Sequence, residues 1–108
     1  MIALPIRGRD GQARLARGLL RSAAAAGLEM TVEAASSRPW ASATFAGTQA
    51  FLVLHAPRAP ALGRWVADLP LAELDMPGHL LASIAVERIE DDGATVRVEL
   101  TALVIERD

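Results

Sequence analysis

The chain has 108 residues, of which 52% are hydrophobic and 22% are charged, and its formal net charge is −2. This size and composition indicate one folded domain and argue against a disordered chain. The sequence contains no cysteine, which excludes disulfides, thiol nucleophiles and cysteine-held metal centres. No segment approaches the run of about 20 apolar residues that a membrane span needs, so we expect a soluble, cytoplasmic protein.

Charge is distributed unevenly along the chain. Residues 1–64 hold eight arginines and three acids, whereas residues 65–108 hold three arginines and ten acids. Such a difference favours steered or head-to-tail contacts between molecules, unless folding interleaves the two halves. Arginine supplies every basic charge, and together with the abundance of alanine and leucine this bias points to a GC-rich bacterial genome.

The first third of the chain predicts a helix between two strands. Residues 2–6 form a possible short strand, and residues 10–27 predict a helix with Asp10 as N-cap and Gly27 just past its end. One broad helical face is apolar and becomes alanine-rich: Leu15, Ala16, Leu19, Leu20, Ala23 and Ala26. Arg14, Arg17 and Arg21 form a stripe opposite. Alternating apolar residues then predict a strand over residues 28–34, which the sequence SSRP at 36–39 interrupts.

A first β-hairpin is predicted over residues 40–55, with Gly47 and Thr48 as a two-residue turn. This register places three apolar pairs on one face: Phe45 with Ala50, Ala43 with Leu52 and Ala41 with Leu54. On the other face it pairs Trp40 with His55. A turn at Ala46 and Gly47 would mix polar and apolar residues on both faces, so we prefer the first register.

The segment 57–77 is rich in proline and predicts a connection that covers part of the sheet. A short helix from about residue 60 to residue 68 fits its apolar spacing, because proline is tolerated in a first turn and Pro70 ends the run. Trp65 lies on the apolar face of this helix.

A second hairpin over residues 79–106 is predicted from the Asp92-Gly93 turn signal. Its register pairs Leu81 with Val104 and Ile89 with Val96. The opposite face is charged near the turn and becomes apolar towards the strand ends, at these residues: Leu80, Ala82, Ile84, Leu103 and Ile105. We expect this apolar patch to be covered by the Trp65 helix, by another protein chain or by a small ligand.

These elements predict an α+β domain spanning residues 1–108. It has an antiparallel sheet of about five strands, one alanine-rich amphipathic helix packed on the sheet, and a short second helix before the C-terminal hairpin. Small residues of the sheet at 41, 43, 50 and 85 are expected to face Ala23 and Ala26 of the helix. No family motif selects a function for this layout.

The two histidines are the candidates for chemistry, each with an ordinary structural interpretation beside it. His55 is able to titrate near neutral pH, but no carboxylate or nucleophile lies at catalytic spacing from it. The predicted register places His79 opposite Glu106, a pair that is either functional or a simple cross-strand ion pair. No metal-binding or cofactor-binding motif is present.

Trp40 and Trp65 are two of four aromatic residues and suit either an interface or the core. The arginine stripe is short and lies in an acidic chain, so we expect neither nucleic-acid nor membrane binding. The residues expected at an interface or ligand surface are Trp40, His55, Trp65, His79, Leu80, Ile84, Leu103 and Ile105.

The sequence leaves two classes of function open. The first is a noncatalytic interaction module that forms a homodimer or binds another protein through the apolar patch. The alternative is a small-molecule-binding domain or minor enzyme, with a pocket between the sheet and the segment 57–77 and with His55 or His79 as its polar anchor. No cofactor is expected in either case.

Overall fold

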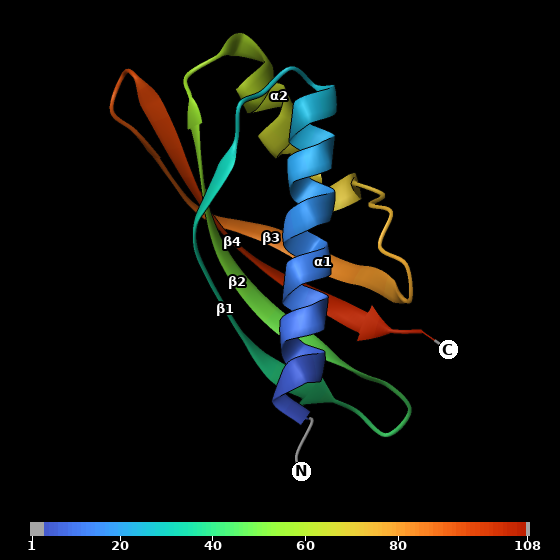
Figure 1. The fold of residues 1–108 in the computed structure, drawn as a ribbon. Helices are drawn as coiled ribbons and strands as arrows, with labels where there is room; N and C mark the ends of the chain where they lie inside the picture. The colour runs from blue at the N-terminus through green and yellow to red at the C-terminus, as the bar shows by residue number, and fades with distance from the viewer. Residues whose placement is uncertain (1–3, 108) are drawn as a thin grey trace.

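The computed structural model describes residues 4–107, with side chains from Gly11 onward. Within this range the chain forms an α+β fold whose elements are α1 (Leu4–Ala25), β1 (Thr31–Ala41), β2 (Ala46–Pro57), α2 (Pro60–Asp68), the 3-10 turn η1 (Leu69–Leu71), β3 (His79–Asp91) and β4 (Thr95–Glu106). All strand pairs are antiparallel, and the order β1-β2-β4-β3 makes β1 and β3 the sheet edges (Figure 1).

Helix α1 begins earlier than the sequence pattern predicts. The strand predicted over residues 2–6 is not found, because residues 4–6 belong to α1, and residues 1–3 lie outside the described part of the chain. Pro5 fits this arrangement, since proline is well tolerated in a first helical turn. Asp10 therefore lies within the helix and is not its N-cap.

The predicted end of α1 is confirmed. Gly27 has a φ of +81°, the left-handed conformation that glycine adopts without steric cost. Its N–H donates to the Ala24 carbonyl, and the Leu28 N–H donates to the Ala23 carbonyl, each at 2.9 Å. These two bonds form the Schellman arrangement that closes a helix C-terminus.

One continuous strand, β1, replaces the predicted strand at 28–34 and the first arm of the predicted hairpin, so the sheet has four strands and not five. The β1–β2 turn lies at residues 42–45, where the Ser42 Oγ accepts the Phe45 N–H at 3.1 Å. Pro39 does not interrupt β1, because a missing N–H is tolerated on an edge strand. The register pairs Trp40 with Gly47 and Thr31 with His55, so the predicted Trp40–His55 pair is wrong.

Gly47 has a different role from the predicted turn. It lies inside β2, and a Cβ added there would collide with the Val104 carbonyl oxygen of β4. Glycine is required at this position because β2 and β4 approach each other closely here.

The β3–β4 register is partly confirmed. Leu81 pairs with Val104 as predicted, but irregularities at Ala82 and Glu87 shift the pairing by two residues near the turn, where Ile89 faces Val98 and not Val96. The predicted Asp92-Gly93 turn is displaced by one residue. Gly93, with a φ of +94°, and Ala94 form the loop, and the Asp92 N–H donates to the Thr95 carbonyl at 3.2 Å. The extra residues of β3 are accommodated as bulges, which edge strands tolerate.

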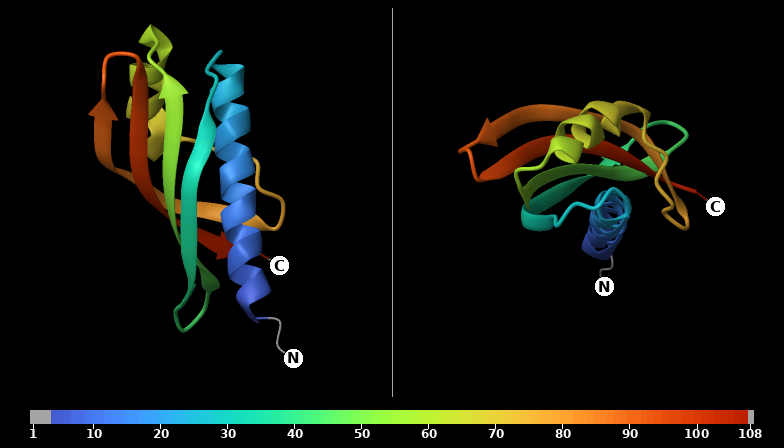
Figure 2. Two further views of the ribbon diagram at one scale, coloured as in Figure 1. Left: turned by 60° about the vertical axis from the view of Figure 1, so that its left-hand side comes forward. Right: turned by 90° about the horizontal axis from the view of Figure 1, so that it is seen from above.

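Both helices lie on one face of the curved sheet, called here the inner face, and enclose the core (Figures 1 and 2). Leu15 and Leu19 of α1 are fully buried in one cluster with Leu62 and Trp65 of α2. The sheet contributes these buried residues to the cluster: Ala50, Leu52, Leu54, Ala56, Val96, Val98, Leu100, Ala102 and Val104. Packing is therefore predominantly aliphatic.

The predicted close packing of small residues holds only in part. Ala23 of α1 and Ala50 of β2 are buried as expected, whereas the alanines at 26, 41, 43 and 85 are exposed. The changed strand registers moved Ala41 and Ala43 to the end of β1 and its turn. Close contact occurs instead at Gly11, where an added Cβ would lie 2.8 Å from the Thr48 Oγ1.

The predicted short helix is confirmed as α2, and Pro70 follows it within η1. This segment closes the inner face beyond the reach of α1. No helix in the described residues 4–107 is long and apolar enough to cross a membrane.

Candidate functional site

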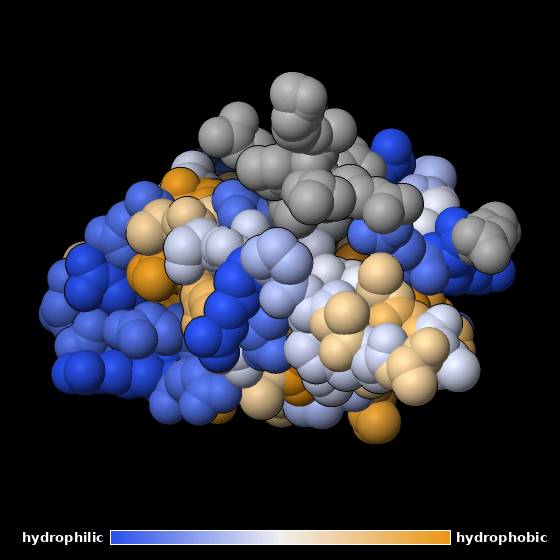
Figure 3. Space-filling view, turned by 90° about the horizontal axis from the view of Figure 1, so that it is seen from below, coloured by the Kyte–Doolittle hydropathy of each residue, from blue (hydrophilic) through white to orange (hydrophobic). Residues whose placement is uncertain are grey.

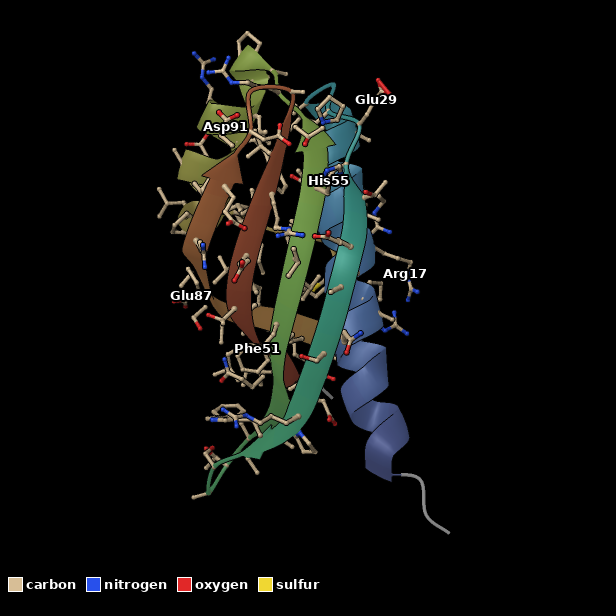
Figure 4. The ribbon with its side chains drawn as sticks, turned by 90° about the vertical axis from the view of Figure 1, so that its left-hand side faces the viewer. Arg17, Glu29, Phe51, His55, Glu87 and Asp91 are labelled. Atoms are coloured by element: carbon tan, nitrogen blue, oxygen red, sulfur yellow. The ribbon has the colours of Figure 1, made fainter. Side chains whose placement is uncertain are left out.

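The outer face of the sheet, opposite α1 and α2, carries no helix (Figure 4). The strand registers place five larger apolar residues on its half away from the β3–β4 turn: Trp40, Phe51, Leu80, Leu103 and Ile105. We call these five residues the outer apolar surface. Phe51 is 36% exposed and Leu80 is 51% exposed, so the core does not account for these two side chains.

Gly47 organises one end of this surface. It stands between Trp40 on β1 and Ile105 on β4 in the same row of the sheet. The place of a side chain at Gly47 is taken by the backbone of β4, since an added Cβ would meet the Val104 carbonyl oxygen and lie 3.1 Å from the Ile105 Cα. Ile105 is only 7% exposed although it lies outside the main core cluster, which shows that the outer face has some packing of its own.

Three charged residues on the outer face, Arg38, Glu87 and Glu99, have no ion-pair partner within residues 11–107. Glu87 accepts a hydrogen bond from the Thr101 Oγ1 at 2.9 Å. The Arg38 guanidinium lies 5.6 Å from the centre of the Phe51 ring, a cation–π geometry that covers part of the ring. Glu99 of β4 is half-buried and lies opposite Arg88, whose guanidinium bonds to Glu90 instead. One cation and two anions thus lie beside the outer apolar surface without forming ion pairs with one another.

The other half of the outer face holds an ion network centred on Arg97. Its Nε and Nη2 donate to the two Glu33 carboxylate oxygens at 2.7 and 2.8 Å, and its Nη1 donates to Glu90 at 3.2 Å. The hydrogen bond from Arg97 lowers the pKa of Glu33, and the two carboxylates raise the pKa of Arg97. The network joins β1, β4 and β3 across the sheet.

His55 lies beneath this network, because it pairs with Arg97 on one side and with Thr31 on the other. A shallow hollow of about 420 Å³ collects His55 together with Glu33, Glu90, Asp91, Asp92, Thr95 and Arg97. The Arg97 guanidinium binds the Glu33 and Glu90 carboxylates. In the part of the chain that the structure describes, no group of three or more histidine or carboxylate side chains is arranged so that it could hold a metal ion. The arrangement is suited to holding the strands together rather than to acid–base chemistry.

His79 lies apart from the outer face. Its register partner is Glu106, as predicted, and its Nδ1 is 3.1 Å from the Pro77 carbonyl oxygen. The ring approaches Gly11 of α1, since a Cβ added to that glycine would be 3.9 Å from the His79 Cδ2. His79 therefore ties the start of β3 to α1, and the structure does not bring it near His55.

Two further residues of the expected surface belong to the core. Trp65 is 8% exposed, and its Nε1 donates to the Ser22 Oγ at 3.0 Å, so it joins α2 to α1. Ile84 is buried on the inner face because the bulge at Ala82 reverses the predicted side of β3. The structure thus gathers Trp40, Leu80, Leu103 and Ile105 on one half of the outer face and places His55 on the other half.

Sequence reasoning missed the residues of a groove on the inner face. The groove has a volume of about 510 Å³ and runs between α2 and the β3–β4 hairpin. Its lining residues are Arg58, Ala59, Pro60, Leu62, Gly63, Val66, Ile89, Asp91 and Val96. A pocket between the sheet and the segment 57–77 was expected, but neither His55 nor His79 lines it. Ile89, an apolar residue beside the charged hairpin tip, is the signal in the sequence that marks this place.

The sheet edges are unsuited to pairing with another strand. β1 contains Pro39 and a register shift at Glu33, and β3 contains the two bulges. Such features interrupt the regular row of N–H and C=O groups that a new strand would need. The outer face, and not an edge, is therefore the available sheet surface.

One member of the arginine stripe of α1 makes a contact within the chain, since the Arg21 Nη2 donates to the Asp75 backbone carbonyl at 2.8 Å.

Comparison with known proteins gave no match: no family model matches the chain, and no curated protein and no solved structure matches it significantly.

Proposed function

We propose that the chain is a noncatalytic interaction module that forms a homodimer through its outer apolar surface. The observation that carries this proposal is the exposure of Phe51 and Leu80 on a sheet face that no helix covers. Antiparallel sheets with one solvated face normally present polar residues on that face, so apolar side chains there favour a partner.

A second copy of the chain is the partner that the charges favour. In a two-fold dimer the same surface meets itself, so each Arg38 can approach a Glu99 of the other copy. The Arg97 network lies on the half of the outer face away from the outer apolar surface and can remain in water. A dimer built in this way buries apolar residues and pairs Arg38 with Glu99, while Glu87 keeps its hydrogen bond to the Thr101 Oγ1. Burying an unpaired charge would be costly.

The expected affinity is moderate. Half of a four-stranded face measures about 19 Å by 20 Å from strand spacing and residue rise, which is less than the roughly 800 Å² per partner of a standard interface. Seen from the end with the β1–β2 turn, hydrophobic residues reach the surface at several separate places among hydrophilic ones (Figure 3). We therefore expect a dissociation constant on the order of micromolar.

The test is the solution mass by light scattering over a concentration series. The wild type is expected to shift from monomer to dimer with increasing concentration. Leu103→Glu and Leu80→Glu place a charge in the interface and are expected to remain folded monomers. Leu71→Glu is the matched control, because Leu71 is highly exposed in η1, outside the outer apolar surface, and this variant is expected to dimerise like the wild type.

The Leu80 variant keeps the test decisive, because a half-exposed edge position tolerates a charge even where Leu103→Glu unfolds the protein. A wild type that stays monomeric at all concentrations would contradict the proposal. Equal dimerisation of Leu80→Glu and Leu71→Glu would show that association uses a different surface.

A further inference from the structure

The groove under α2 is an apolar site that the core leaves open. Ile89 lies on the inner face of β3 opposite Val98 of β4, which is buried, yet Ile89 is 53% exposed. Val66 of α2 forms part of the wall, and Val96 of β4 forms part of the floor. Exposed apolar surface on the core side of a sheet is the setting in which small ligands bind.

Gly63 keeps the groove wide. It lies within α2 and lines the groove, and a Cβ added there would meet no atom within 4 Å. Its φ is not positive, so its backbone does not require glycine. The absent side chain leaves room beside Ile89.

One end of the groove carries a single guanidinium. The Arg58 Nε donates to the Asp91 Oδ2 at 2.9 Å, and this bond holds the side chain at the rim. Its two terminal nitrogens, Nη1 and Nη2, have no partner among the described residues. The Asp91 carboxylate is already engaged on its other oxygen, which accepts the Gly93 N–H at 2.8 Å.

We propose that this groove binds a small amphipathic carboxylate, with its apolar chain between α2 and the hairpin and its carboxylate on Arg58. The Nη1–Nη2 edge of a guanidinium matches a carboxylate in bidentate geometry. The groove volume lies within the range of about 300–1,000 Å³ found for small-molecule sites. The site is on the opposite face of the sheet from the outer apolar surface, so it does not depend on dimer formation.

The decisive measurement compares two ligands that have the same hydrocarbon chain length and differ in their head group. Decanoate and decanol are titrated separately into the full chain by calorimetry, below the concentration at which decanoate forms micelles. Decanoate is expected to bind with one site per chain and about tenfold more tightly than decanol, because only the carboxylate gains charge-assisted bonds to Arg58. NMR shift changes are expected at the methyl groups of Ile89, Val66 and Val96.

Three variants separate the two parts of the site. Arg58→Met keeps an apolar stem and is expected to reduce decanoate affinity to that of decanol, with decanol binding unchanged. Gly63→Leu fills the groove and is expected to weaken both ligands at least tenfold without lowering the Tm. Ala67→Leu is the control, because Ala67 is an exposed residue of the same helix outside the groove, and it is expected to leave both affinities unchanged.

Each contrary result would overturn a stated part of the proposal. Equal affinities of decanoate and decanol in the wild type would exclude recognition of the carboxylate by Arg58. Unchanged binding in Gly63→Leu, or shift changes confined to the outer face, would exclude the groove. The absence of saturable decanoate binding to the wild type would reject the site altogether, and it would leave the dimer proposal untouched.

Discussion

The contact between Trp65 and Ser22 is expected to determine how α2 docks on α1. The indole N–H is part-buried and has the Ser22 Oγ, 3.0 Å away, as its hydrogen-bond acceptor. Ser22→Ala removes this acceptor and leaves a buried donor unsatisfied, whereas Trp65→Phe removes the donor and part of the ring.

The magnitude follows from two opposing effects of Ser22→Ala. An unsatisfied buried donor costs about 1–3 kcal/mol, and alanine gains roughly 0.5 kcal/mol over serine inside a helix. We therefore expect Ser22→Ala to lower the free energy of unfolding by about 0.5–2.5 kcal/mol. When Trp65 is replaced by phenylalanine, Ser22→Ala no longer leaves an N–H without an acceptor. The loss of unfolding free energy in the double variant should therefore be about 1 kcal/mol smaller than the sum of the losses in the single variants.

The assay is urea unfolding of the wild type, both single variants and the double variant, at one protein concentration because dimerisation would shift the midpoints. Ser83→Ala, at an exposed position of β3, is the control and should change stability by less than about 0.5 kcal/mol. A stabilised Ser22→Ala variant, or strictly additive losses, would refute the claim that this hydrogen bond fixes α2.

Two further predictions concern the sheet. Gly47→Ala should destabilise the fold by about 1–3 kcal/mol because its Cβ meets the Val104 carbonyl oxygen. Gly63→Ala, whose Cβ meets no atom within 4 Å, should stabilise α2 by about 0.5–1 kcal/mol. Thermal unfolding compares the two variants, and stability changes of the same sign would contradict this explanation. Because the hydrogen bond from Arg97 lowers the pKa of Glu33 from its ordinary value of 4.5, the pair stabilises the fold above pH 4.5 and loses this effect as the pH falls through the lowered pKa. The stability difference between the wild type and Arg97→Met should therefore shrink in acid, and a constant difference in urea midpoints between pH 7 and pH 3 would argue against it.

Local signals in the sequence predicted the elements whose cause is local. The Gly27 helix end, the short helix at Pro60–Asp68 and the hairpin around Gly93 each depend on a few adjacent residues, and each was found. The division of the outer face into a charged half and an apolar half was also visible, since side chains alternate along strands. Leu80, Leu103 and Ile105 therefore lie on the expected side.

Strand register was not predictable in the same way. A bulge adds one residue to one strand, so every residue beyond it points to the opposite face of the sheet. The residue types around Ala82 do not predict such a bulge. That single feature moved Ile84 into the core. Likewise, Pro39 is compatible with β1 only because β1 lies at the edge of the sheet, and strand order is a property of the whole fold.

The sequence by itself determined the end of α1, the short helix α2 and the C-terminal hairpin, because capping, turn formation and periodicity act between neighbours in the chain. Only the tertiary structure decided which surfaces remain open. The groove joins Arg58 to Asp91 across 33 residues of sequence, and the Arg97 network reaches Glu33 across 64 residues. Such contacts arise from the strand order of the sheet, where small shifts in register determine which side chains meet.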